Sequence, residues 1–183
     1  LIMPVTGASI AGLIAMGRFK RDLENGTIDL ISAHAISRLR LYVGYVGSGV
    51  LFTLGAWLAA IYSMFVAQAI VMPTPITIAK FNAVAVNAFP ILLFFVGLAA
   101  ILLGWLPKWY RLVYLVLGLN FYMLYLGKML KMPEWLIQVM PSSWVAQAPL
   151  SAIDWGSWVV VLTLALALIG LGYLGYRQGD LRD

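Results

Sequence analysis

The chain has 183 residues, of which 63% are hydrophobic and only 10% are charged, and its mean hydropathy is +0.94. Soluble domains are about 45–50% apolar and about 25% charged, so this composition excludes a soluble globular protein and indicates an integral membrane protein. The net charge of +5 does not indicate a nucleic-acid partner, because the basic residues stand at the ends of apolar runs. The lack of cysteine excludes disulfides, zinc–thiolate sites and cysteine nucleophiles.

The apolar runs predict an all-α integral membrane fold with five spanning helices. A helix needs about 20 apolar residues to cross a bilayer, and the sequence has no alternation of the kind found in barrel strands. The chain starts at Leu1 inside an apolar run, so we expect residues 1–16 to be the end of a span and the chain to be part of a longer protein. Complete spans are predicted at 41–65, 83–103, 109–128 and 155–176.

Residues 17–40 hold the densest group of charges and must face water, because charged side chains are costly in hydrocarbon. Alternating spans place nine Lys and Arg residues on the side of this stretch and three on the other. The positive-inside rule makes the first side cytoplasmic, together with the tail 177–183. The nine are Arg18, Lys20, Arg21, Arg38, Arg40, Lys108, Arg111, Arg177 and Arg182, and the three are Lys80, Lys128 and Lys131.

The polar stretch is predicted to form two short helical pieces that are broken at Asn25-Gly26. Thr27 can cap the second piece, and Ser37 can cap the span that follows. An apolar face with flanking charges suits a groove on a soluble partner. An ordinary loop between two spans explains the same pattern equally well, because periodicity over so few residues decides little.

Two connections are expected on the outer side. Residues 71–82 contain Pro73 and Pro75 and cannot continue a straight helix. The longer connection, 129–154, is predicted to hold a short amphipathic helix on the membrane surface. Pro133 suits its start and Pro141 its end, and Asp154 can cap the last span. The apolar face of this helix would comprise Trp135, Leu136, Val139 and Met140.

Asn120 is a polar residue in the middle of a predicted span. It can face a substrate path, with Phe121 and Met123 as apolar lining, or it can form an interhelical hydrogen bond. Gly170, Gly172 and Gly175 match a dinucleotide-binding spacing, but they lie in an apolar span, so close helix packing is the better interpretation. No catalytic, cofactor-binding or metal-binding residue is predicted.

The segment Glu24-Asn25-Gly26-Thr27, with Leu30-Ile31 and Ile36-Ser37-Arg38 after it, resembles the cytoplasmic loop of ABC-2 type transporter permeases. In that family the loop is the coupling helix that docks on the ATPase subunit. The C-terminal half is similar to exporters of polyketide antibiotics at 104–107, 132–136 and 175–177. The resemblance assigns ATPase coupling to Glu24, Gly26, Thr27, Ile28, Leu30, Ile31, Ser37 and Arg38.

The resemblance implies a permease that exports hydrophobic or amphipathic compounds, such as antibiotics or lipids, across a bacterial plasma membrane. ATP and Mg²⁺ would be held by a separate ABC ATPase, so this chain would not be an enzyme. A half-permease has six spans, and the chain matches the end of span two through span six. A second permease half would be a further partner. The alternatives are a membrane-embedded enzyme and a scaffold subunit that does not transport.

Overall fold

A computed structural model describes residues 2–24, 38–127, 129–145 and 152–178. The elements are the α-helices α1 (Ile2–Glu24), α3 (Arg38–Val71), α4 (Ile78–Trp105), α5 (Leu112–Leu126), α6 (Glu134–Gln138) and α7 (Trp155–Gln178), with the 3₁₀ helices η1 (Pro107–Trp109) and η2 (Pro141–Ser143). Within these ranges there is no strand, and the prediction of a helical fold is confirmed.

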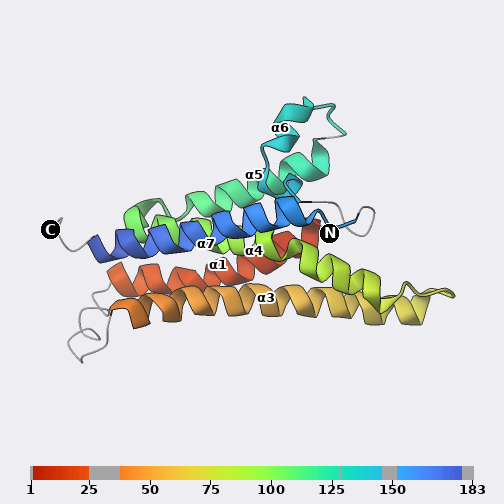
Figure 1. The fold of residues 1–183 in the computed structure, drawn as a ribbon, viewed down its shortest axis with the longest axis horizontal. Coiled ribbons are helices and arrows are strands. Elements are labelled where there is room, and N and C mark those ends of the chain that lie inside the picture. The colour runs from red at the N-terminus through yellow and green to blue at the C-terminus, as the bar shows by residue number, and fades with distance from the viewer. Residues whose placement is uncertain (1, 25–37, 128, 146–151, 179–183) are drawn as a thin grey trace.

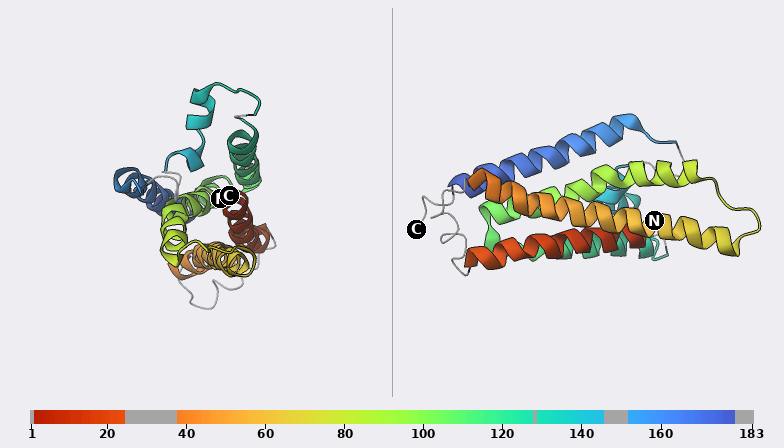
Figure 2. Two further views of the ribbon diagram at one scale, coloured as in Figure 1. Left: turned by 90° about the vertical axis from the view of Figure 1, so that its right-hand side faces the viewer. Right: turned by 90° about the horizontal axis from the view of Figure 1, so that it is seen from below.

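The long helices run antiparallel in chain order (Figure 1). At one end of the bundle, α1 ends, α3 begins, α4 turns into α5 and α7 ends; we call this the basic end. The connection between α3 and α4 and the segment that contains α6 lie at the opposite end. Figure 2 shows α4 near the middle of the bundle, and α4 contacts α1, α3, α5 and α7.

In the part of the chain that the structure describes, three helices are long and apolar enough to cross a membrane, namely Leu39–Val71, Ile78–Trp105 and Trp155–Gln178. Among the residues described, Ile2–Arg18 is a shorter apolar stretch, and α5 has 15 residues. At 1.5 Å per residue α5 is about 22 Å long, which is less than the hydrocarbon thickness of about 30 Å. Three of the five predicted spans are therefore supported by length and composition.

The helix boundaries differ from the predicted spans at the α3–α4 connection. α3 continues to Val71, and α4 begins at Ile78. The connection is therefore confined to residues 72–77, within the predicted range 71–82. Pro73 and Pro75 explain the break, and the apolar residues after Thr77 allow the helix to resume earlier than expected. The cap of α7 is as predicted, because the Gly156 backbone N–H donates to Asp154 Oδ1 at 3.1 Å.

The outer helix is also shorter than predicted. α6 has five residues, from Glu134 to Gln138, and its apolar side chains do not share one environment. Trp135 and Val139 are exposed, whereas Leu136 and Met140 are half-buried. The four predicted apolar side chains are therefore exposed to different degrees, and part of the helix packs back on the bundle: Ile137 lies against Gly127 at the end of α5.

Small residues let α4 and α7 pack with their backbones in contact. A Cβ atom at Gly104 would overlap the Gly172 carbonyl oxygen, and one at Gly172 would lie 2.5 Å from that of Ala100. Gly175 faces the ring of Trp105 in the same way, whereas Gly170 has nothing within 4 Å. Close packing is thus confirmed for Gly172 and Gly175 but not for Gly170.

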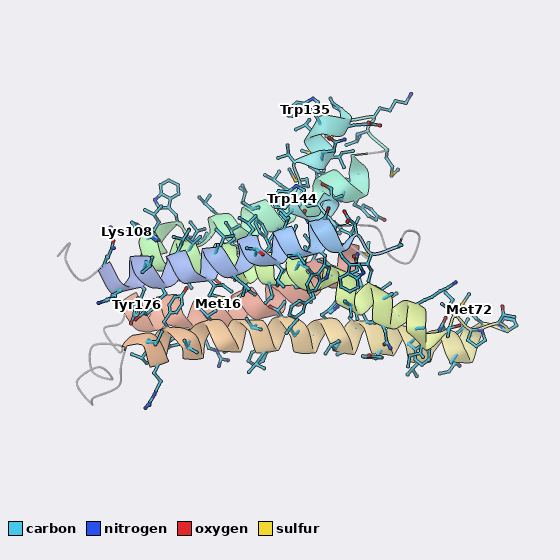
Figure 3. The ribbon with its side chains drawn as sticks, in the orientation of Figure 1. Met16, Met72, Lys108, Trp135, Trp144 and Tyr176 are labelled. Atoms are coloured by element: carbon cyan, nitrogen blue, oxygen red, sulfur yellow. The ribbon has the colours of Figure 1, made fainter. Side chains whose placement is uncertain are left out.

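A second close contact joins α1 to α3. A Cβ atom at Gly12 would lie 2.6 Å from the Gly49 carbonyl oxygen, and one at Gly49 would overlap the Met16 side chain. Met16 is fully buried and lies between the two helices in Figure 3. The bundle therefore contains two helix pairs, α1–α3 and α4–α7, that are held at close range by glycine.

Pro90 lies inside α4 and leaves one backbone carbonyl without its helical partner. Proline has no N–H, so the Val86 carbonyl cannot receive the usual bond from four residues ahead. The Trp158 indole Nε1 of α7 donates to this oxygen at 2.9 Å. Trp57 of α3 donates to the neighbouring Ala85 carbonyl at 3.2 Å. Two tryptophans from two other helices thus donate hydrogen bonds to backbone carbonyl groups of α4 near the proline, and they hold α4 in place there.

Gly172→Ala and Gly170→Ala form a matched pair that tests the glycine contact. Gly172→Ala should destabilise the fold by roughly 1–3 kcal/mol, because the new methyl meets the backbone of α4. Gly170→Ala should be neutral or stabilise by up to about 1 kcal/mol, since it only replaces glycine in a helix. Thermal unfolding in detergent measures both. Equal melting temperatures for the two variants would contradict the close α4–α7 packing.

The Pro90–Trp158 relationship is tested by a double-mutant cycle. Trp158→Phe removes the indole donor and should lower stability by roughly 1 kcal/mol. In a Pro90→Ala background the same change should have a smaller effect, because the introduced alanine supplies a backbone N–H to the Val86 carbonyl. Titration with a denaturing detergent gives the four free energies, and Trp135→Phe, at an exposed position of α6, is the control. Strictly additive effects of Pro90→Ala and Trp158→Phe would rule out the compensation.

Candidate functional site

The predicted coupling region falls largely outside the residues described. α1 ends at Glu24 and α3 begins at Arg38, and both positions lie at the basic end (Figure 1). The predicted residues Gly26, Thr27, Ile28, Leu30, Ile31 and Ser37 lie outside the described ranges. The described part of the site therefore consists of α1 and α3, the two helices that flank residues 25–37.

A tyrosine connects the end of α1 to the turn between α4 and α5. The Tyr110 hydroxyl donates to the Leu13 backbone carbonyl of α1. Tyr110 is only 3% exposed, and its ring lies 3.7 Å from the position that a Cβ atom would take at Gly17. α1 also packs against α3 and α4, so a displacement of its last turns acts on α3, on α4 and on the turn before α5.

A second tyrosine connects the start of α3 to α7. The Tyr42 hydroxyl donates to the Ile169 backbone carbonyl at 2.6 Å. The Tyr42 ring also packs against two tyrosines of α7, with ring centroids 5.5 Å from Tyr173 and 5.9 Å from Tyr176. Tyr176 lies near the basic end in Figure 3. The two helices that flank residues 25–37 are therefore held by separate tyrosines to separate helices.

The second part of the candidate site lies around Asn120 on α5. This side chain is 1% exposed, and its Nδ2 donates to Ser142 Oγ at 2.9 Å. The Ser142 backbone N–H donates back to Asn120 Oδ1 at 3.2 Å. The hydrogen bond predicted as one alternative for Asn120 is thus present, but it joins α5 to the segment after α6 rather than to another long helix.

Residues 141–145 enter the bundle between α5 and α4, and we call them the inserted segment. Pro141 and Val145 are buried. The ring of Trp144 meets that of Phe94 edge-on at 5.4 Å, and its Nε1 donates to the Gln138 carbonyl at 3.0 Å. Trp144 points toward the bundle in Figure 3, whereas Trp135 lies on the far side of α6. Backbone that is not α-helical is tolerated beside the long helices because protein covers part of it.

Of the two residues predicted to line a path with Asn120, Met123 shares its side of α5, whereas Phe121 does not. Phe121 stacks on Tyr125, with centroids 5.5 Å apart and planes at 8°. Successive residues of a helix are about 100° apart, so Phe121 faces away from the side on which Asn120 meets Ser142. Met123 is half-buried, one turn after Asn120. Ser142 and Trp144, which sequence reasoning missed, carry no local signal beyond their position after Pro141.

A family model described as multidrug efflux system permease Rv1217c, C-terminal domain, matches residues 1–177. The chain belongs to this family. No curated protein matches the chain. The helical bundle is therefore a permease domain of a membrane transporter, and this permease is similar to the C-terminal part of efflux proteins of that description.

The charges of the permease are distributed unequally between its two ends. Lys80 and Lys131 lie at the opposite end, as do Glu134 and Asp154. Hydrogen bonds from Ser157 and from the Gly156 backbone hold the pKa of Asp154 below its usual value. The exposed basic side chains described at the basic end are Arg18, Arg21, Arg40, Lys108, Arg111 and Arg177.

A double-mutant cycle tests the hydrogen-bonded pair of Asn120 and Ser142, with the neighbouring Ser143 as a matched control. Asn120→Ala and Ser142→Ala should each increase hydrogen exchange of residues 141–145, because each removes one partner of a buried pair. The double variant should exchange no faster than the stronger single variant. Ser143→Ala is the control, since its hydroxyl bonds only to Gln138 and Met140. Its effect should add to that of Asn120→Ala, and additivity in both cycles would exclude a specific Asn120–Ser142 interaction.

Proposed function

We propose that the chain is the permease component of an ATP-driven ABC exporter, which moves hydrophobic or amphipathic compounds out of the cell. The family match over residues 1–177 carries this proposal. It is supported by the resemblance of residues 24–38 to the coupling loop of ABC-2 permeases. ATP and Mg²⁺ belong to a partner ATPase, and a second permease half completes the transmembrane unit.

The proposed orientation places the basic end in the cytoplasm. Six exposed Lys and Arg side chains are described at that end and two at the opposite end, and cytoplasmic loops of membrane proteins carry an excess of these residues. Residues 24–38 then face the cytosol, where an ATPase is available, and the C-terminus is also cytoplasmic. The membrane is the plasma membrane of a bacterium.

The proposed mechanism couples two separate sites. The ATPase binds residues 24–38, and closure of the ATPase on ATP displaces the ends of α1 and α3. Tyr110 passes this displacement to α5, and Tyr42 passes it to α7. Because such coupling is reciprocal for binding, a bound substrate should also change the affinity of the ATPase for nucleotide.

The proposed substrate path runs along α5 past Asn120, Phe121 and Met123. Methionine and aromatic side chains adapt to apolar ligands of different shapes, which suits cargo of varied structure. Exposed apolar residues on α5 include Leu115, Leu119 and Tyr122. The inserted segment covers the buried side of this path through its bond to Asn120.

Glu24→Arg and Leu30→Asp test the coupling role. Each variant should insert into the membrane normally but lose the co-purified ATPase, because a charge reversal or a buried carboxylate opposes docking. Met72→Asp is the control, since Met72 lies at the opposite end of the bundle (Figure 3). Retention of the ATPase and normal substrate-stimulated ATP hydrolysis in both coupling variants would reject the role assigned to residues 24–38.

Purification of the wild-type complex under mild conditions tests the function itself. A stoichiometric ABC ATPase, together with ATP-dependent uptake of an apolar dye into inverted vesicles, is the expected result. A complex that contains no ATPase would favour the scaffold or the membrane enzyme instead. Native mass spectrometry of the intact complex also reads out whether a second permease half is present.

A further inference from the structure

The turn between α4 and α5 exposes apolar and basic side chains side by side. Tyr110 points inward and is 3% exposed, but Trp109 is 57% exposed and Leu106 is 52% exposed. Lys108 and Arg111 are exposed between them. Lys108 projects outward at the basic end in Figure 3. Tryptophan beside Lys or Arg is typical of the boundary between lipid and water.

The neighbouring helix ends bring further positive charge to this turn. On one side, the Trp105 indole donates to the Leu171 carbonyl at 2.9 Å, and Gly175 faces the Trp105 ring. Arg177 follows Gly175 by two residues, so it lies at the same end. On the other side, Tyr110 is bonded to Leu13 of α1, whose last turns carry the exposed side chains of Arg18 and Arg21.

The segments 18–40, 108–111 and 177–183, which belong to this end, together carry nine Lys and Arg residues against five Asp and Glu residues, so their net charge is positive. Glu134 and Asp154 are the acidic residues whose side chains the structure describes, and both lie at the opposite end. The exposed apolar residues of the turn favour a position in contact with lipid over one that faces only water. Anionic lipid headgroups explain both the positive charge and the exposed apolar side chains of this turn, because a headgroup lies at the same depth as tryptophan at the membrane boundary.

We propose that Lys108, Arg111 and Arg177, with Trp109, form a surface that binds the headgroups of anionic phospholipids. The choice of the cytoplasmic leaflet rests on the proposed orientation of the transporter, whereas the binding itself does not. The attraction is electrostatic, so it weakens with ionic strength. Each Lys or Arg near an anionic membrane surface contributes about fivefold in affinity, and removal of three should reduce the preference for anionic lipid by roughly a hundredfold at low salt.

Quenching by brominated lipids tests this surface. The complete permease is reconstituted into nanodiscs with brominated phosphatidylglycerol or brominated phosphatidylcholine, and tryptophan fluorescence is recorded. Stronger quenching by the phosphatidylglycerol is expected, and Trp109→Phe should remove most of the difference. Lys108→Gln/Arg111→Gln/Arg177→Gln should abolish the difference. Lys80→Gln/Lys131→Gln, which neutralises the opposite end, should leave it intact.

A variant that keeps the charge controls for damage to the fold. Lys108→Arg/Arg111→Lys/Arg177→Lys should retain the preference for phosphatidylglycerol. Equal quenching by both lipids in the wild type, or an unchanged preference in the triple Gln variant, overturns the proposal. Loss of the ATPase from the triple Gln variant with unchanged lipid quenching also overturns it, and assigns the surface to the ATPase. Because the lipid measurement requires no ATPase, its outcome is independent of the proposed transport function.

Discussion

The bundle depends on how backbone carbonyl groups are satisfied where water is excluded. A membrane span contains few charged side chains, so ion pairs are not available to join its helices. Here aromatic side chains join the helices instead: the indole N–H or phenol O–H of one helix or turn donates a hydrogen bond to a backbone carbonyl of another. Each bond requires a carbonyl oxygen at a set height, and thereby fixes the vertical position of one helix relative to the next. Among the residues described, the donors that join long helices to one another or to the turn before α5 are Tyr42, Trp57, Trp105, Tyr110 and Trp158.

These bonds and the glycine contacts divide the bundle into parts of different rigidity. α1 with α3, and α4 with α7, meet at glycine, and closely packed backbones cannot slide without a clash. Between the two pairs, Tyr42 of α3 bonds to α7 and packs on two of its tyrosines, and Trp57 of α3 bonds to α4. Backbone contact at glycine therefore restrains movement within each pair more than movement between the pairs.

Hydropathy predicted the long helices, and residue chemistry predicted Asp154 as the cap of α7. These features depend on neighbours in the sequence. Other contacts join residues that are far apart in the chain. These are the hydrogen bond between Asn120 and Ser142, the ring contact between Trp144 and Phe94, and the hydrogen bond from Trp158 to the Val86 carbonyl. Neither the hydrophobic periodicity of a segment nor the helix propensity of its residues identifies such distant partners. Gly170 and Gly172 show the same limit, since only the structure tells which of two equal residues faces another helix.

The length of α3 has a consequence for access to the protein from the face opposite the basic end. The helix has 34 residues and is about 51 Å long, against a hydrocarbon layer of about 30 Å. Trp57 is tied to Ala85 beside the Trp158 contact, so the last fourteen residues of α3 extend beyond the first turn of α7. Together with the start of α4, they project beyond the other long helices at this end (Figure 1). A peptide epitope placed at Pro73–Pro75 would stand at the tip of this projection and report from which side of the membrane it can be reached.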